Sequence, residues 1–162
     1  MMRPSSTKVS DISAVTLRRM SAADVSAALS ILEESPEAAM WSRESLLESA
    51  ARGTAWAAEL DGRVAGILIG QVAADEFEIL NLAVAKANRR HGIAIQLLKA
   101  ALESARAAGA RKIYLEVRAS NEAGIAFYSR MGFRVSGRRP NYYRDPVEDA
   151  VLLALHTNGS SA

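Results

Sequence analysis

The chain has 162 residues, of which 49% are hydrophobic and 23% charged, so its length and composition are those of an ordinary globular domain with a sizeable core. Its 20 lysines and arginines are nearly balanced by 18 acidic residues, which argues against a protein that binds nucleic acid directly. Cysteine is absent and the two histidines, His91 and His156, lie far apart in sequence. These facts exclude a disulfide framework and a thiol nucleophile, and they disfavour a zinc site.

The two ends of the chain lack the pattern of a packed segment. Residues 1–12 carry positive charge without a following apolar stretch, so they do not resemble a secretory signal and we expect a disordered tail. Residues 13–157 are expected to form a single domain, and residues 158–162 a frayed end. No apolar run has the length of a membrane span, so we expect no membrane partner and take the cytoplasm as the default location.

The first half of the chain predicts two helices set among strands. The Asp61-Gly62 dipeptide between two apolar runs is typical of a hairpin turn. In chain order, the predicted elements are a strand over 15–18, helices over 22–33 and 43–51, and strands over 55–60, 64–72 and 77–84.

The second half alternates helices with strands. A long helical pattern closes at Gly109. It is followed by a strand over 113–117, a short helix from about 122 to 131, and two terminal strands. An antiparallel first half followed by strand-helix-strand crossovers predicts an α+β fold with a mixed sheet.

A basic, glycine-containing turn joins the strand over 77–84 to the long helix, and it reads Arg89-Arg90-His91-Gly92-Ile93-Ala94. The first backbone N–H groups of a helix have no partner within the helix and the macrodipole is positive there, so main chain alone can hold a pyrophosphate. Gly92 and Ala94 keep the approach open, and the two arginines can reach phosphate oxygens. The spacing fits neither a Walker A loop nor a dinucleotide fingerprint. A solvated turn is the alternative interpretation.

Three motifs together resemble those of a known family. Arg89-x-x-Gly92-x-Ala94 is similar to the acetyl-CoA pyrophosphate loop of the GNAT superfamily of N-acetyltransferases. Leu115-Glu-Val-Arg-Ala-Ser-Asn121 runs into Ala-Phe-Tyr128-Ser-Arg-Met-Gly132-Phe133, and Arg139-Pro-Asn-Tyr142-Tyr143 follows. Over residues 13–156 the chain resembles the bacterial ribosomal-protein-alanine N-acetyltransferases of the RimI type, although Ala85-Lys-Ala-Asn88 stands where that family usually has Asp-Pro-x-Tyr.

The resemblance implies the GNAT (acyl-CoA N-acyltransferase) fold, a mixed central sheet flanked by helices on both faces. It implies acetyl-CoA as cosubstrate, without a metal. Main-chain groups of the stretch Leu82-Ala83-Val84 are implied to bind the pantetheine arm, and the loop over 89–94 the pyrophosphate. Asn121 is implied to combine a CoA contact with capping of the following helix, and capping alone is the simpler interpretation.

Two carboxylates are candidates for the general base that the acceptor amine requires. Ile113, Leu115 and Val117 share one face of a strand, which places Glu116 on the other face with Tyr114 and Arg118. The resemblance implies Glu116 as the base, whereas the strand pattern alone suggests a glutamate paired with a neighbouring arginine. Glu78, on the preceding strand, is the competitor, because other GNAT enzymes take their base from that strand.

Tyr128 is implied to be the general acid that protonates the departing CoA thiolate. The helical spacing of Ile125, Tyr128 and Met131 also fits a core position. A tyrosine can satisfy both roles, with its ring packed and its hydroxyl free.

The acceptor is implied to be the N-terminal alanine of a small-subunit ribosomal protein. Tyr142 and Tyr143 could form a wall of its groove, with Trp41, of the element Met40-Trp41-Ser42, near the mouth; hairpin packing is the alternative. Other functions left open are acetylation of a small amine or a protein lysine, and a non-catalytic acyl-CoA-binding regulatory module.

Overall fold

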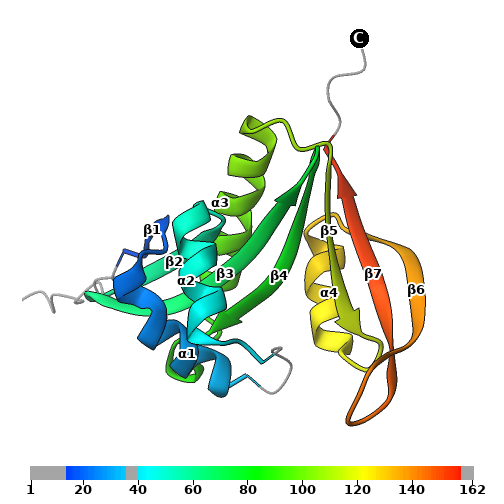
Figure 1. The fold of residues 1–162 in the computed structure, drawn as a ribbon, viewed down its shortest axis with the longest axis horizontal. Coiled ribbons are helices and arrows are strands. Elements are labelled where there is room, and N and C mark those ends of the chain that lie inside the picture. Colours follow the sequence, from blue (N-terminus) through cyan, green and yellow to red (C-terminus); the bar gives the residue numbers. More distant parts are fainter. Residues whose placement is uncertain (1–13, 36–39, 158–162) are drawn as a thin grey trace, which may run out of the picture.

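A computed structural model of the chain describes residues 14–35 and 40–157, so the predicted tail over 1–12 and the frayed end over 158–162 lie outside the described residues. The sheet has seven strands in the order β1-β2-β3-β4-β5-β7-β6 (Figure 1). The strands are β1 (Thr16–Arg19), β2 (Ala55–Leu60), β3 (Arg63–Ala73), β4 (Glu76–Val84), β5 (Lys112–Arg118), β6 (Arg134–Tyr143) and β7 (Glu148–His156). The helices are α1 (Val25–Glu33), α2 (Arg43–Arg52), α3 (Ile93–Ala107) and α4 (Glu122–Arg130), with 3-10 turns at Ala22–Asp24 and Lys86–Asn88.

These elements confirm the predicted order and the mixed sheet. The Asp61-Gly62 turn has positive φ at both residues, 51° and 75°, which is the geometry of a tight hairpin between β2 and β3. Helix α2 begins where the Ser42 hydroxyl accepts a hydrogen bond from the Ser45 amide at 3.1 Å. The predicted first helix differs in one detail, because its first turn, Ala22–Asp24, is a 3-10 helix.

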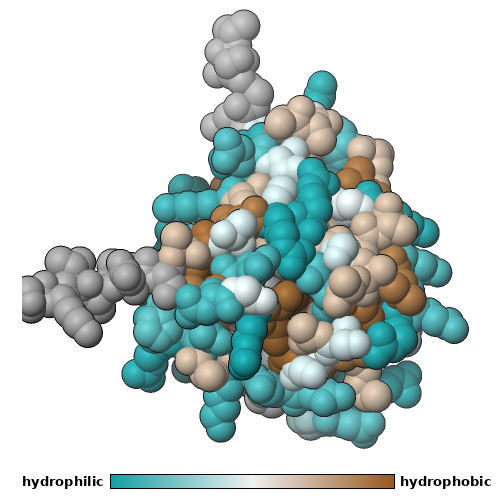
Figure 2. All heavy atoms as spheres, turned by 90° about the vertical axis from the view of Figure 1, so that its left-hand side faces the viewer, coloured by the Kyte–Doolittle hydropathy of each residue, from teal (hydrophilic) through white to brown (hydrophobic). Residues whose placement is uncertain are grey.

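The two faces of the sheet carry separate cores. Helices α1 and α2 pack against one face, where Val25, Leu46 and Ile67 are fully buried. Helices α3 and α4 lie on the other face over a cluster that includes Leu97, Leu98 and Leu115. At the β1 end of the sheet, seen in Figure 2, hydrophilic side chains surround smaller hydrophobic areas. None of the helices in 14–35 and 40–157 is long and apolar enough to cross a membrane.

The sheet divides between β4 and β5. Strand β4 pairs with β3 along its length, with a register shift opposite Leu80, but it pairs in parallel with β5 only from Glu76–Lys112 to Ile79–Leu115. Beyond these residues the two strands splay apart (Figure 1). Strand β5 instead pairs with β7 over its whole length, so the sheet continues on the far side of a wedge-shaped opening.

Candidate active site

A cleft of about 350 Å³ occupies the opening between β4 and β5. Its walls come from both strands, from the starts of α3 and α4, and from the end of β6. The lining residues are Ser35, Ile79, Leu80, Asn81, Leu82, Ala94, Leu115, Glu116, Val117, Arg118, Asn121, Gly124, Phe127, Tyr128 and Tyr143. A second hollow, of about 490 Å³, lies by Arg134, Ser136 and His156 and contains none of the predicted site residues, so we assign the chemistry to the first.

The edge of β4 supplies the cleft with main-chain groups. Leu82, Ala83 and Val84 pair with β3 on one side, whereas the parallel pairing with β5 has already ended at Ile79. Their remaining N–H and C=O groups are therefore free of the β5 ladder and can pair with an extended amide chain, as a missing strand would. One of them is used within the protein, because the Val84 carbonyl accepts a hydrogen bond from Arg89.

The start of α3 closes one end of the cleft. Gly92 is the N-cap residue, with φ of 74° and no side-chain cap, and its α-carbon faces open space. Ala94, two residues after Gly92, lines the cleft. The helix sits close to the sheet because Gly66 lies beneath it, where an added Cβ would meet Ile93 and Leu97 at 3.0 Å. The uncapped amides at Ile93 and Ala94 are thus placed for an anion.

The arginines of the loop differ in their contacts. Arg90 has φ of 68° and is exposed, as is His91. Arg89, in contrast, donates to the carbonyls of Val84 and Glu34, both at 3.2 Å. The Glu34 carboxylate also accepts the Lys86 amide at 2.8 Å, so the loop is tied to the end of α1. Glu34 was not a candidate, since nothing in its local pattern signals this long-range contact.

Glu116 lies on the predicted face of β5 and lines the cleft. Its side chain is only 11% exposed, and Arg139 Nε lies 2.9 Å from its Oε1. The carboxylate also accepts a hydrogen bond from the Tyr142 hydroxyl, and this bond, followed by burial, raises the pKa of Tyr142. The predicted pairing with an arginine is therefore present, but the partner comes from β6 and not from the neighbouring Arg118, which pairs with Glu148 at 3.3 Å.

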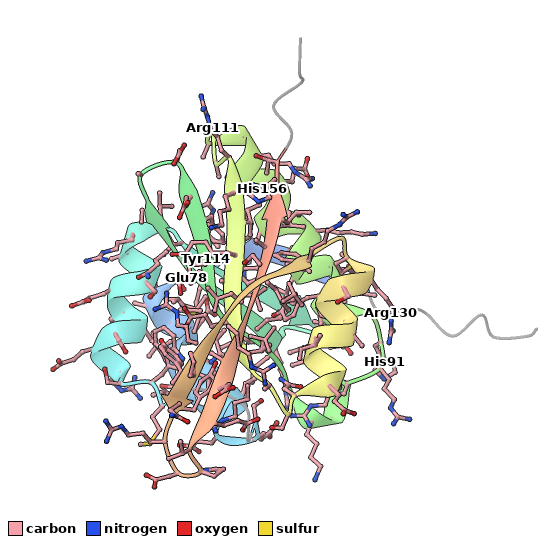
Figure 3. All side chains as sticks on the ribbon, turned by 90° about the vertical axis from the view of Figure 1, so that its right-hand side faces the viewer. Glu78, His91, Arg111, Tyr114, Arg130 and His156 are labelled. Atoms are coloured by element: carbon pink, nitrogen blue, oxygen red, sulfur yellow. The ribbon has the colours of Figure 1, made fainter. Side chains whose placement is uncertain are left out.

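Glu78 shares that face of the sheet but is not among the residues lining the cleft. Its carboxylate accepts hydrogen bonds from Gln71 at 2.7 Å and from the Tyr114 hydroxyl at 3.3 Å (Figure 3). Burial and the charge of Glu78 raise the pKa of Tyr114. Both carboxylates have two donors, but only Glu116 lines the cleft, so the geometry favours Glu116 as the group that meets the acceptor.

Tyr128 combines the two positions expected of it. It is 8% exposed, and its ring makes edge-to-face contacts with Phe127 and Phe133, with centroids 5.1 and 5.5 Å apart. It also lines the cleft. Burial raises the pKa of Tyr128 well above its usual range, so its phenol stays protonated.

Asn121 caps α4, as predicted. Its side-chain oxygen accepts the Gly124 amide at 2.9 Å, and both residues line the cleft. An added Cβ at Gly124 would lie 2.6 Å from Asn121 Nδ2, so a larger residue there would displace the capping side chain. The cap therefore places a polar side chain at the cleft wall.

The three aromatic residues predicted to contact the acceptor, Tyr142, Tyr143 and Trp41, lie in different places. Tyr143 lines the cleft, with the Arg118 guanidinium 4.5 Å above its ring, and burial raises the pKa of Tyr143 to about 12. Tyr142 is half exposed and meets Tyr143 edge to face. Trp41 packs against the core beneath α1 and α2, with its indole N–H buried and unpaired in the described part of the chain, and it does not line the cleft.

A split mixed sheet, a free strand edge and an uncapped helix start beside a carboxylate define the class of acyl-CoA-dependent acyltransferases. The chain belongs to the acetyltransferase (GNAT) family, whose sequence pattern matches residues 20–133. The comparisons confirm the family and fold predicted from the motifs.

Within this family, the chain is similar to ribosomal-protein-alanine N-acetyltransferases of the RimI type. The [ribosomal protein bS18]-alanine N-acetyltransferase of Escherichia coli (strain K12) is 39% identical over 97 residues, which are 59% of this chain and 66% of that protein, just under two thirds of its length. The crystal structure of the ribosomal-protein-S18-alanine N-acetyltransferase from Escherichia coli superposes with a TM-score of 0.81 at 30% identity, covering 92% of this chain and 99% of that one. The crystal structure of Ard1 from Thermoplasma volcanium superposes with a TM-score of 0.82 at 27% identity, covering 89% of this chain and 98% of that one.

Proposed function

We propose that this protein transfers the acetyl group of acetyl-CoA to the α-amino group of an N-terminal alanine, on a small-subunit ribosomal protein in the cytoplasm. The observation that carries the proposal is that Glu116 and Tyr128, from β5 and α4, line one cleft beside the free edge of β4. The names of the Escherichia coli relatives support the choice of acceptor.

Different parts of the cleft suit different parts of acetyl-CoA. The uncapped amides at the start of α3 suit the pyrophosphate, with Arg90 close enough in sequence to add a charge. The free edge over Leu82, Ala83 and Val84 suits the amides of the pantetheine arm. An N–H of this edge can then stabilise the oxyanion that forms on the acetyl carbonyl.

The carboxylate of Glu116 supplies the base. An N-terminal amine has a pKa of about 7.7–8, against about 10.4 for lysine, so a carboxylate acting directly or through one water can remove its proton. The amine nitrogen then forms a bond to the carbonyl carbon, and the carbon–sulfur bond breaks as the oxyanion collapses. The extra proton on the nitrogen passes to the departing sulfur, so the products are a neutral amide and the free thiol. No enzyme-bound acyl intermediate is required, which agrees with the absence of cysteine.

Tyr128 serves the leaving group. A thiol has a pKa of about 8.5, below that of a buried phenol, so the equilibrium keeps the proton on the tyrosine. Tyr128 therefore stabilises the departing thiolate mainly as a hydrogen-bond donor, and its rate contribution is smaller than that of the base.

Free-thiol release from acetyl-CoA tests this function. The acceptors are a short peptide with a free N-terminal alanine, its N-terminally blocked copy, a blocked copy carrying lysine, and a small primary amine. We expect turnover with the free alanine alone. Turnover confined to lysine or the small amine would refute the acceptor, and CoA binding without turnover would indicate a non-catalytic module.

A further inference from the structure

The ion pair between Arg139 and Glu116 connects two strands that are not neighbours. Strand β7 lies between them, with Leu152 opposite Glu116 and Ala150 opposite Arg139. Ala150 is fully buried and has only a methyl side chain. Figure 3 shows β6 slanting across β7 toward the side of α2, which brings its second half over the face that carries Glu116.

The two members of the pair differ in freedom. Glu116 stands on a central strand and its side chain is 11% exposed, whereas the Arg139 side chain is 54% exposed on an edge strand. Arg139 contacts the carboxylate through Nε, and its guanidinium lies 5.7 Å from the ring of Tyr142. Arginine can leave for water at little cost, but a carboxylate so buried is costly without a cationic partner.

The same carboxylate must receive the acceptor. Near neutral pH an N-terminal amine is largely an ammonium ion, since its pKa is about 7.7–8. Its proton has to move from nitrogen to a Glu116 oxygen, or to a water held there, before the lone pair can attack. An arginine bound to that carboxylate occupies the oxygen to which the ammonium group would bind.

We propose that Arg139 is a positioning residue that holds the Glu116 carboxylate until the acceptor's ammonium group replaces it. This exchange rests on the proposed function of Glu116 and adds a selection step to it. When the acceptor binds, its ammonium group takes the place of the Arg139 guanidinium at the Glu116 carboxylate. The released guanidinium moves into water beside Tyr142. Only then does the ammonium proton pass to Glu116. An acceptor without a cationic amine gains nothing from the exchange.

The test is the acceptor KM of Arg139→Met, which keeps the aliphatic stem and removes the charge. Because the competing cation is gone, we expect KM for the alanine peptide to fall about fivefold, the size of a partly exposed ion pair. The values of kcat and of KM for acetyl-CoA should stay near wild type. Arg139→Lys, which restores the charge, should return the peptide KM toward wild type.

A matched control and a product measurement isolate the exchange. Arg138, the preceding arginine of β6, pairs with Asp149 at the same 2.9 Å, so Arg138→Met should leave the peptide KM unchanged. The N-acetylated product peptide has no ammonium group and should inhibit wild type and Arg139→Met equally. An unchanged or higher peptide KM in a folded Arg139→Met protein overturns the exchange alone. Absence of wild-type turnover on every N-terminal peptide overturns the proposed function and the exchange with it.

Discussion

Two arginine–carboxylate pairs at opposite ends of the sheet use the same chemistry for different purposes. At the β1 end, Arg18 binds both oxygens of Asp24, at 2.6 and 2.9 Å, and Ser21 donates its amide to the same carboxylate. Toward the β6 end, Glu116 is held by two exposed side chains of β6, Arg139 at 2.9 Å and the Tyr142 hydroxyl. A carboxylate satisfied by several fixed donors stabilises the fold, whereas one held by exposed side chains of an edge strand stays available for chemistry.

The pKa of Asp24 reflects its several fixed donors. Hydrogen bonds from Arg18 lower the pKa of Asp24 from 3.8 to about 2. Because the folded value is depressed, the stabilisation is complete above pH 3.8 and is lost as the pH falls through about 2. The Asp24 pair thus belongs to the acid stability of the fold.

The largest expected effect comes from removing the available carboxylate. Glu116→Gln keeps the shape of the side chain but cannot accept the ammonium proton, so kcat should fall about 100-fold or more. The Kd for acetyl-CoA, measured by calorimetry, should remain near wild type, because the CoA groups are bound by β4 and α3. Unchanged turnover would remove Glu116 as the base and make Glu78→Gln the next variant to assay.

Removing the fixed carboxylate should give the opposite result. Asp24→Asn breaks a buried pair, and the free energy of unfolding in urea should drop by about 2–3 kcal/mol at neutral pH. The acid loss of stability between pH 4 and 2 should shrink in the variant, because the titrating group is gone. A substantial loss of kcat in the folded variant would contradict the assignment of this pair to stability alone.

Tyr128 tests a residue that serves both folding and chemistry. Tyr128→Phe preserves the ring contacts with Phe127 and Phe133 but removes the donor, so we expect kcat to fall about tenfold. Thermal unfolding should change little. A variant that is less stable but keeps the wild-type kcat while folded would leave Tyr128 as a core residue only.

Asn121 should show the smallest effect of the four. Asn121→Ala removes the cap of α4 and should cost about 1 kcal/mol of stability, whereas Asn121→Ser retains a capping oxygen. If Asn121 also contacts CoA, both variants should raise the KM for acetyl-CoA by a similar factor of a few-fold. Normal KM values in both would restrict Asn121 to capping.

The features predicted from sequence are those that depend on neighbouring residues. Alternation along 113–117 placed Glu116 on the correct face, the Asp61-Gly62 dipeptide marked its hairpin, and the turn over 89–94 marked the start of α3. Their causes are strand pleating, turn geometry and helix capping, which act within a few residues.

The features that escaped prediction depend on contacts across the fold. Arg139 was visible in a motif, but its partner is set by the register of β7 and the slant of β6. Arg89 binds main-chain carbonyls because the end of α1 comes to the loop. Trp41, expected near the groove, packs instead with the α1 and α2 core, where the hydrophobic surface of that helix pair is buried.

The most direct test of the account is to locate the acetyl group on a peptide that carries both a free N-terminal alanine and an internal lysine. After incubation with the enzyme and acetyl-CoA, fragmentation mass spectrometry identifies the modified nitrogen. We expect acetylation of the α-amine, abolished by Glu116→Gln. Acetylation of the lysine, or acetylation of the α-amine at the same rate by Glu116→Gln, would contradict it.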